Sequence, residues 1–247
     1  MRNPDQTRKI GIIGGMGPAA SASFLNVFIQ ECQKRGAVMD SDFPHIILES
    51  IPFPDSDELS CGSIDEVITL TQACVDRMTT AGVEIIVAIC NTIHLHIKRI
   101  FSENGPEFID IKDVVAQEAN EKGYSKVVVL SSQESRNSDL YKTELAEHGI
   151  KCEYPEDLED QKKINNTILN VMRGNIIAAQ SELTDLIKKY TEQTDAVILG
   201  CTELPLALNS DNNQKILDPN RVLAKELARR SMKSSTTKHL LIQPSSH

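Results

Sequence analysis

The sequence lacks the features of a membrane, secreted or nucleic-acid-binding protein. No run of 18 apolar residues is present to cross a bilayer, and the first residues lack the apolar core of a signal peptide. Runs of Lys and Arg never exceed two or three residues, and the formal net charge of −9 repels polyanions. We therefore expect a cytoplasmic protein with neither a membrane nor a nucleic-acid partner.

Paired cysteine spacings are also missing. None of the six cysteines stands in the short spacing of a disulfide scaffold or a zinc site, so we expect reduced thiols. Cys90, His94 and His96 lack a second clustered pair that would complete four metal ligands, so no metal is expected. The cysteines lie at Cys32, Cys61, Cys74, Cys90, Cys152 and Cys201.

Tryptophan is absent, and the apolar residues, 40% of the chain, are mostly Ile, Val, Leu and Ala. This balance is that of an ordinary soluble globular protein. The length of 247 residues allows one large or two small domains, and therefore a cleft between two cores.

Short apolar runs alternate with segments of helical periodicity. The pattern predicts strands at 9–13, 45–51, 84–89, 126–130 and 196–199. It predicts helices at 19–35, 63–81, 113–122, 141–148 and 161–173, one from about residue 93, and a continuation of 161–173 through 189. This alternation indicates an α/β fold with parallel sheets covered by helices.

Two parts of the chain resemble each other. KIGIIGG from Lys9 aligns with KVVVLSS from Lys126, and IVAICNT aligns with AVILGCT, whose cysteines are 111 residues apart. The repeat predicts two pseudo-symmetric domains, each a mainly parallel sheet flanked by helices, with the active site in the interdomain cleft. We expect residues 1–105 plus 210–235 to form the first domain, 106–209 the second, and 236–247 a flexible tail.

Cys90 and Cys201 differ from the other cysteines in their setting. A lone cysteine is usually a small buried apolar residue, and we adopt that interpretation for the other four. These two follow apolar strands, where open parallel sheets bind ligands, and both precede small polar residues. One alternative is a hydrolase with a single nucleophile and His94 or His96 as its base, which needs one cysteine only.

The sequence GGMGP separates the first strand from the first helix. It has neither the dinucleotide-binding spacing nor the Walker lysine, so a nucleotide site is a weak alternative. Gly15, Met16 and Gly17 can instead bring backbone amides to a substrate carboxylate at a helix N-terminus, or simply form a tight turn. Glu203, two residues after Cys201, can orient a thiol, an ammonium group or its own loop, or be an exposed cap.

Three segments together resemble the aspartate/glutamate racemase family: KIGIIGGMGP, AICNTIH and ILGCTELPL, in this order. The resemblance extends from about Lys9 to about Arg230. It implies two α/β domains around a cleft, a homodimer, and catalysis without pyridoxal phosphate or another cofactor. It also implies that Cys90 and Cys201 are the two catalytic thiols.

Racemisation explains the need for two thiols. One face of the substrate loses the α-proton and the other face receives one, so one cysteine acts as thiolate and the other as thiol. A thiol of pKa about 8.5 must be acidified by backbone dipoles or a cation such as the substrate ammonium. The carbanion needs a dry site with donors on the carboxylate, for which we expect Asn91, Thr92, Thr202 and the amides of Gly15 to Gly17.

The resemblance further implies substrate contacts from Ser132 and Ser135, in a loop where Glu134 replaces the family's usual glycine. Ser56 stands where members acting on acidic substrates carry an arginine. Arg173 lies where a basic residue is common and can hold a carboxylate with two hydrogen bonds, the alternative being a solvated helix end.

The leading hypothesis is cofactor-independent racemisation of aspartate, glutamate or both, interconverting L- and D-amino acids. The alternatives are a related paired-cysteine enzyme and a non-catalytic protein. The first class comprises neutral amino-acid racemases, hydantoin racemases and maleate isomerases. The second is a protein that binds an amino acid or dicarboxylate without turnover.

Overall fold

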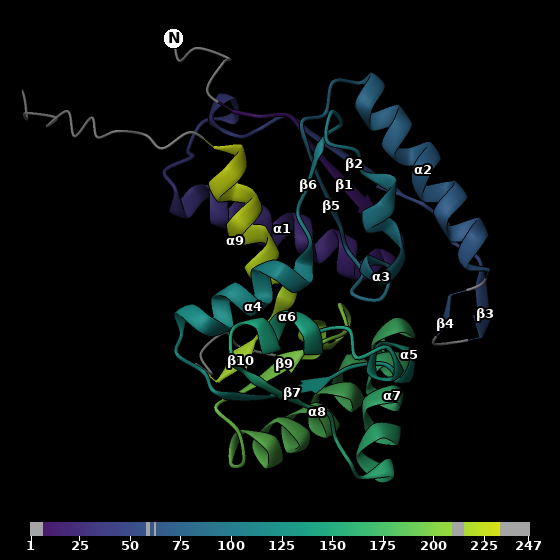
Figure 1. The fold of residues 1–247 in the computed structure, drawn as a ribbon, viewed down its shortest axis with the longest axis vertical. Helices are drawn as coiled ribbons and strands as arrows, with labels where there is room; N and C mark the ends of the chain where they lie inside the picture. Colours follow the sequence, from purple (N-terminus) through teal and green to yellow (C-terminus); the bar gives the residue numbers. More distant parts are fainter. Residues whose placement is uncertain (1–6, 58–59, 62, 209–214, 233–247) are drawn as a thin grey trace, which may run out of the picture.

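The computed structural model describes residues 7–57, 60–61, 63–208 and 215–232, without the side chains of 55–57 and 60–61. The predicted tail at 236–247 lies outside these residues. The described chain forms two four-stranded sheets, the first in the upper and the second in the lower part of Figure 1. All neighbouring strands in both sheets are parallel, so the predicted α/β fold is confirmed.

The two sheets have the same topology. Numbered within each half, the strands of both sheets follow the order 2–1–3–4. The sequence repeat is therefore a structural repeat, and the two strands that precede the cysteine turns occupy equivalent places. The first sheet comprises β2 (Ile46–Ser50), β1 (Ile10–Gly14), β5 (Ile85–Ala88) and β6 (Glu107–Phe108), and the second β8 (Lys151–Glu153), β7 (Lys126–Leu130), β9 (Ala196–Leu199) and β10 (Ile216–Leu217).

The chain passes from one sheet to the other later in the sequence than the predicted domain boundaries. β6, which follows residue 105, still pairs with β5 of the first sheet. β10, which follows residue 210, pairs with β9 of the second sheet. Strands of two residues leave no periodicity to detect in a sequence, which explains the difference. A small antiparallel hairpin, β3 (Asp55–Asp57) and β4 (Ser60–Cys61), extends from the first half.

Every helix that the periodicity predicts is present, one of them in two parts, and two further helices, Gln133–Asn137 and Pro219–Ser231, fall outside the predicted ranges. The segment from 161 to 189 forms two helices, because Gly174 adopts φ +80° and ends the first one. None of the described helices is long and apolar enough to cross a membrane. The bounds are α1 (Pro18–Lys34), α2 (Ile64–Thr80), α3 (His94–Ile97), α4 (Ile111–Glu121), α5 (Gln133–Asn137), α6 (Lys142–Glu147), α7 (Leu158–Met172), α8 (Ile176–Thr191) and α9 (Pro219–Ser231), with short 3₁₀ turns η2 (Asp40–Asp42), η3 (Lys98–Ile100) and η4 (Leu204–Ala207).

The helices α4 and α6 lie between the two sheets, and α9 extends upward from them beside α1 and the first sheet (Figure 1). One buried apolar cluster runs from Ile12 and Val87 in the first sheet, through Val115 and Leu223 in these helices, to Val129 in the second sheet. Since α9 follows β10 and packs against α1, the chain returns to the first half at its end. The two halves therefore share a continuous core, which fixes the cysteine turns relative to each other.

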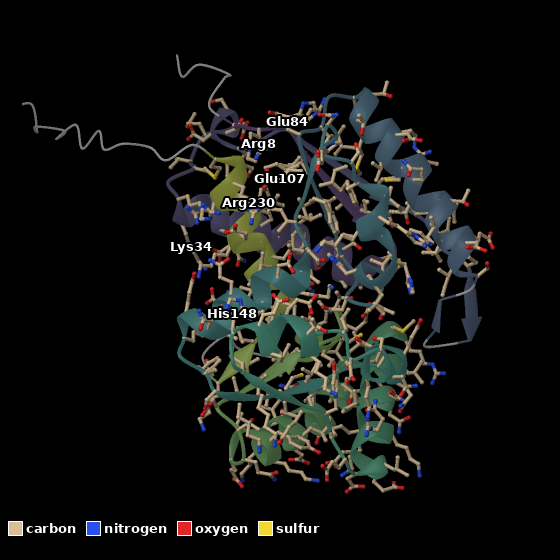
Figure 2. All side chains as sticks on the ribbon, in the orientation of Figure 1. Arg8, Lys34, Glu84, Glu107, His148 and Arg230 are labelled. Carbon is tan, nitrogen blue, oxygen red and sulfur yellow. The ribbon has the colours of Figure 1, made fainter. Side chains whose placement is uncertain are left out.

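Ion pairs hold the end of α9 to the first sheet (Figure 2). Glu107 in β6 accepts hydrogen bonds from Arg8 at 2.5 Å and from Arg230 at 2.6 Å. Partial burial opposes ionisation of Glu107, but the two guanidinium groups lower the pKa of this carboxyl below its usual value. The carboxylate therefore stays charged and ties the N-terminal and C-terminal segments together.

Candidate functional site

The cysteine turns follow the third strand of each sheet, beside the first strand. The register pairs the ends of β1 and β5 in one half and of β7 and β9 in the other. The loop at residues 14–18 therefore begins beside Cys90, and Ser131 lies beside Cys201. Strand order reverses at this point of each sheet, which is where ligands bind in open α/β folds.

Cys90 and Cys201 are both partly buried thiols. Burial raises the pKa of Cys201 well above its usual value, and the charges of Glu203 and of Cys90 raise it further. The influence of Cys90 shows that the two thiols lie within electrostatic range of each other. Because each negative charge opposes the other, the two thiols do not both ionise at neutral pH. The raised pKa of Cys201 means that this thiol is protonated there.

Three other cysteines lie on α1, α2 and β8, away from the two cysteine turns. Burial is the main cause that raises the pKa of Cys32, Cys74 and Cys152 to about 12 in each case. These thiols stay protonated under ordinary conditions, as Cys201 does, so their place in the fold rather than their pKa separates them from the cysteine pair. The side chain of Cys61 lies outside the described part of the structure.

Glu203 joins the second cysteine turn to the first half. One carboxylate oxygen accepts a hydrogen bond from the Thr202 hydroxyl at 2.9 Å and from the Cys201 thiol at 3.0 Å. The other accepts from the backbone N–H of Gly17 at 3.2 Å, at the N-terminus of α1. Glu203 is buried, so it is not an exposed cap.

The glycine loop is shaped by close contacts. Gly15 has φ +110°, and a β-carbon there would lie 2.0 Å from the Ile51 carbonyl oxygen. A β-carbon on Gly17 would lie 2.5 Å from a carboxylate oxygen of Glu203. The Gly15 N–H donates to the Ser21 hydroxyl at 3.1 Å. The turn thus requires glycine at position 15, whereas a side chain at position 17 would displace the Glu203 carboxylate. The amide contacts of both glycines with a substrate stay a prediction.

Asn91 follows Cys90 and is held by a residue of the second half. The hydroxyl of Tyr141, at the start of α6, donates to Asn91 Oδ1. The Nδ2 group of Asn91 is buried and has no hydrogen-bond partner among the described residues. Tyr141 is fully buried. No sequence motif indicates Tyr141, since it is a single tyrosine at the start of a helix.

The loop after β7 forms a turn of helix beside Cys201. Ser132 caps α5 by accepting from the Ser135 N–H at 3.4 Å. Ser135 is buried, and its hydroxyl finds no partner within the described chain. Glu134 lies inside this helical turn, where a residue with a side chain fits better than glycine. Within the described parts of the chain, the two halves therefore each contain a buried polar group without a partner, Asn91 Nδ2 and Ser135 Oγ.

Comparison with known proteins agrees with this geometry. A profile of the Asp/Glu/Hydantoin racemase family matches residues 13–227. The chain belongs to this family. The enzyme class expected from the sequence, an isomerase of the racemase type, is thereby confirmed.

Individual relatives cover nearly the whole chain. A protein of Bacillus subtilis (strain 168), the broad specificity amino-acid racemase RacX, is 27% identical over 226 residues, which span 87% of this chain and 95% of that protein. An aspartate racemase homologue from Pyrococcus horikoshii OT3 is 27% identical, with a TM-score of 0.74 over 90% of this chain and 98% of the other. The Picrophilus torridus aspartate racemase, 24% identical, shares the fold with a TM-score of 0.75 over 91% and 96% of the two chains.

The remaining residues that are predicted to contact the substrate lie in different parts of the structure. Thr202 is buried, and its carbonyl accepts from Asn220 of α9 at 3.3 Å. Thr92 and Met16 are partly buried in the first half, and Met16 packs against the same apolar cluster as Cys90. Arg173 is the exposed C-cap of α7.

Ser56 belongs to β3, and its side chain lies outside the described part of the structure. The substrate contacts of all these residues stay predictions.

His94 is engaged in the first half. Its Nε2 lies 3.2 Å from the Ala88 carbonyl and its Nδ1 lies 3.0 Å from Asp110 Oδ1, and the ring is buried. Burial opposes ionisation of Asp110, but its hydrogen bond with His94 lowers the pKa of this carboxyl. With both ring nitrogens bonded in this way, His94 is poorly suited to be the base of a cysteine hydrolase. In the described residues no group of three or more His, Cys, Asp or Glu side chains is arranged to hold a metal ion.

Proposed function

We propose that the protein racemises aspartate, glutamate or both by a two-base mechanism that uses Cys90 and Cys201. One observation carries the proposal: thiols at equivalent ends of the third strand of each half lie close enough for the charge of one to raise the pKa of the other. Inversion at a stereocentre needs an acid and a base of this kind on opposite sides of one carbon.

The environment of Cys201 assigns the roles at the start of a turnover. Because burial and Glu203 keep Cys201 protonated, we assign the role of thiolate to Cys90. Cys90 takes the α-proton as the C–H bond breaks, and the electron pair spreads into the substrate carboxylate. The Cys201 S–H bond then breaks, and its proton goes to the other face of the α-carbon. Cys201 is left as thiolate, and proton exchange restores the starting form.

Buried donors of both halves stabilise the charge that develops on the carboxylate. The Nδ2 group of Asn91 and the hydroxyl of Ser135 are available for this role because neither has a described partner in the protein. Hydrogen bonds formed in a site that excludes water are stronger than in solution and need no reorganisation. No pyridoxal phosphate or other cofactor takes part in these steps.

The choice of an acidic substrate rests on the family and its named members. RacX is named as a racemase of broad specificity, and a structural neighbour is named as an aspartate racemase homologue. Ser56 replaces the arginine expected for a side-chain carboxylate, which leaves Arg173 as our candidate for that contact. We further propose a cytoplasmic homodimer, for which light scattering of the purified protein measures the subunit number.

The test is racemisation of both enantiomers of aspartate, glutamate and several neutral amino acids, followed by circular dichroism with dialysed protein. We expect turnover of an acidic amino acid, and its loss in Cys90→Ala and in Cys201→Ala. Cys152→Ala, which removes a thiol on β8 outside the cysteine turns, should keep full activity. Turnover of hydantoins or of maleate alone would overturn the substrate assignment, and full racemisation by either active-site variant would overturn the mechanism.

A further inference from the structure

Tyr141 connects the second half of the molecule to the first cysteine turn. It belongs to the second half, yet its hydroxyl donates to Asn91, the residue after Cys90. Burial raises the pKa of Tyr141 well above its usual value, and among the further causes is the charge of Cys201. One phenol thus contacts the first turn and lies within electrostatic range of the second. It also remains protonated, and so a donor, at neutral pH.

This hydrogen bond fixes the orientation of the Asn91 side chain. A carboxamide has an oxygen that only accepts and an NH₂ group that only donates, on opposite sides of one carbon. Because the phenol donates to Oδ1, the NH₂ group must point away from Tyr141. That group is buried and lacks a partner in the described chain, although buried N–H groups are nearly always hydrogen-bonded. An acceptor outside the protein is the simplest partner for it.

We propose that Tyr141 is a positioning residue for the reaction, and that its phenol turns the Asn91 NH₂ group toward the α-carboxylate of a substrate bound beside Cys90. The inference rests on the proposed function, because it takes the bound acceptor to be the carboxylate of an amino acid. It adds a dependence between the halves: the donor of the first half is correctly oriented only while α6 of the second half packs against it.

The kinetic test uses Tyr141→Phe, Asn91→Ala and the combined variant. Without the phenol the carboxamide can turn by half a rotation and present its oxygen to the carboxylate, so we expect kcat/KM to fall about tenfold. Asn91→Ala removes a charge-assisted hydrogen bond, and we expect a loss of about a hundredfold. Because Tyr141 acts through Asn91, the combined variant should be no worse than Asn91→Ala, and additive losses would overturn the proposal.

Tyr190 supplies a matched control. It is buried, and its hydroxyl donates to Asp160 at 2.6 Å between α7 and α8. Tyr190→Phe therefore removes a comparable buried phenol that has no contact with Asn91. We expect a lower melting temperature with unchanged kcat/KM. If Tyr141→Phe behaves in the same way, Tyr141 is structural and the proposal is wrong.

A second readout is independent of turnover. In the ¹⁵N-labelled full-length protein, the carboxamide signals of Asn91 are assigned by their loss in Asn91→Ala. In Tyr141→Phe we expect these signals to shift and their hydrogens to exchange faster with solvent. Unchanged signals would overturn the proposed orientation. A wild-type protein that exchanges no α-proton would instead overturn the proposed function, while the amide signals would still decide the role of Tyr141.

Discussion

Replacing Glu203 by glutamine removes the negative charge nearest to the Cys201 thiol, so the pKa of Cys201 should fall. The carboxylate oxygen lies 3.0 Å from the sulfur. At that separation two unit charges interact by about 1.4 kcal/mol in bulk water and by about 5.5 kcal/mol at an effective dielectric constant of 20. Since Cys201 is partly accessible to solvent, the value lies between these limits, which corresponds to a fall of about 1 to 4 pKa units.

The assay is the pH dependence of alkylation of Cys201 by iodoacetamide, followed by mass spectrometry of its peptide. Only the thiolate reacts, so the midpoint of the profile reports the pKa. A Cys90→Ser background removes the charge of the second thiol. At neutral pH the Glu203→Gln protein should react at least about tenfold faster. Glu159→Gln, which removes an exposed carboxylate on α7, should leave the profile unchanged.

The same shift should appear in catalysis. Cys201 must be a thiol to donate its proton. In Glu203→Gln the pKa of Cys201 is expected to be lower, so Cys201 loses this proton at a pH closer to neutral. The alkaline limb of the kcat/KM profile should therefore move to lower pH by the same number of units as the alkylation midpoint. If both profiles stay where they are in the wild type, Glu203 does not control the protonation of Cys201 and the assignment of the starting form is refuted.

Two further substitutions test the glycine loop. Gly15→Ala, at φ +110° with the new carbon 2.0 Å from a backbone oxygen, should lower the free energy of unfolding in urea by about 3 kcal/mol. Gly36→Ala, at φ +92° with open space around it, should lower it by only about 1 kcal/mol, and equal losses would contradict the steric argument. Gly17→Ala puts a methyl group 2.5 Å from a Glu203 oxygen and should displace that carboxylate. The alkylation midpoint should then move in the same direction as in Glu203→Gln, and a midpoint that rises would be inconsistent with this contact.

Much of the fold could be predicted because its central strands are continuous apolar runs. The predicted strands at 126–130 and 196–199 coincide with β7 and β9, since strands buried on both faces leave an unbroken signal. The edge strands β6, β8 and β10 have two or three residues each, too few for any periodicity. Helix α9 was not predicted either, and its position against α1 and α4 depends on packing between distant segments, which a local sequence pattern does not show.

For the site as for the fold, local sequence patterns identify some residues, while others depend on contacts between distant parts of the chain. Cys90 and Cys201 stand out in the sequence because each follows an apolar strand and the pattern repeats. The partners that orient the site do not stand out: Tyr141 lies 50 residues from Asn91 along the chain. A contact of this kind depends on how the two halves pack against each other. A single sequence does not predict that packing.

The central claim is most directly tested by α-deuterium incorporation in heavy water, measured for each enantiomer separately with Cys90→Ala and Cys201→Ala. A remaining thiolate can remove and return hydrogen on its own face only. We therefore predict that neither variant racemises, that Cys201→Ala exchanges one enantiomer through Cys90, and that exchange by Cys90→Ala is confined to the opposite enantiomer and is slower, because burial and Glu203 keep Cys201 mostly protonated. Exchange of the same enantiomer by both variants, or racemisation by either at the wild-type rate, would contradict two opposed thiols.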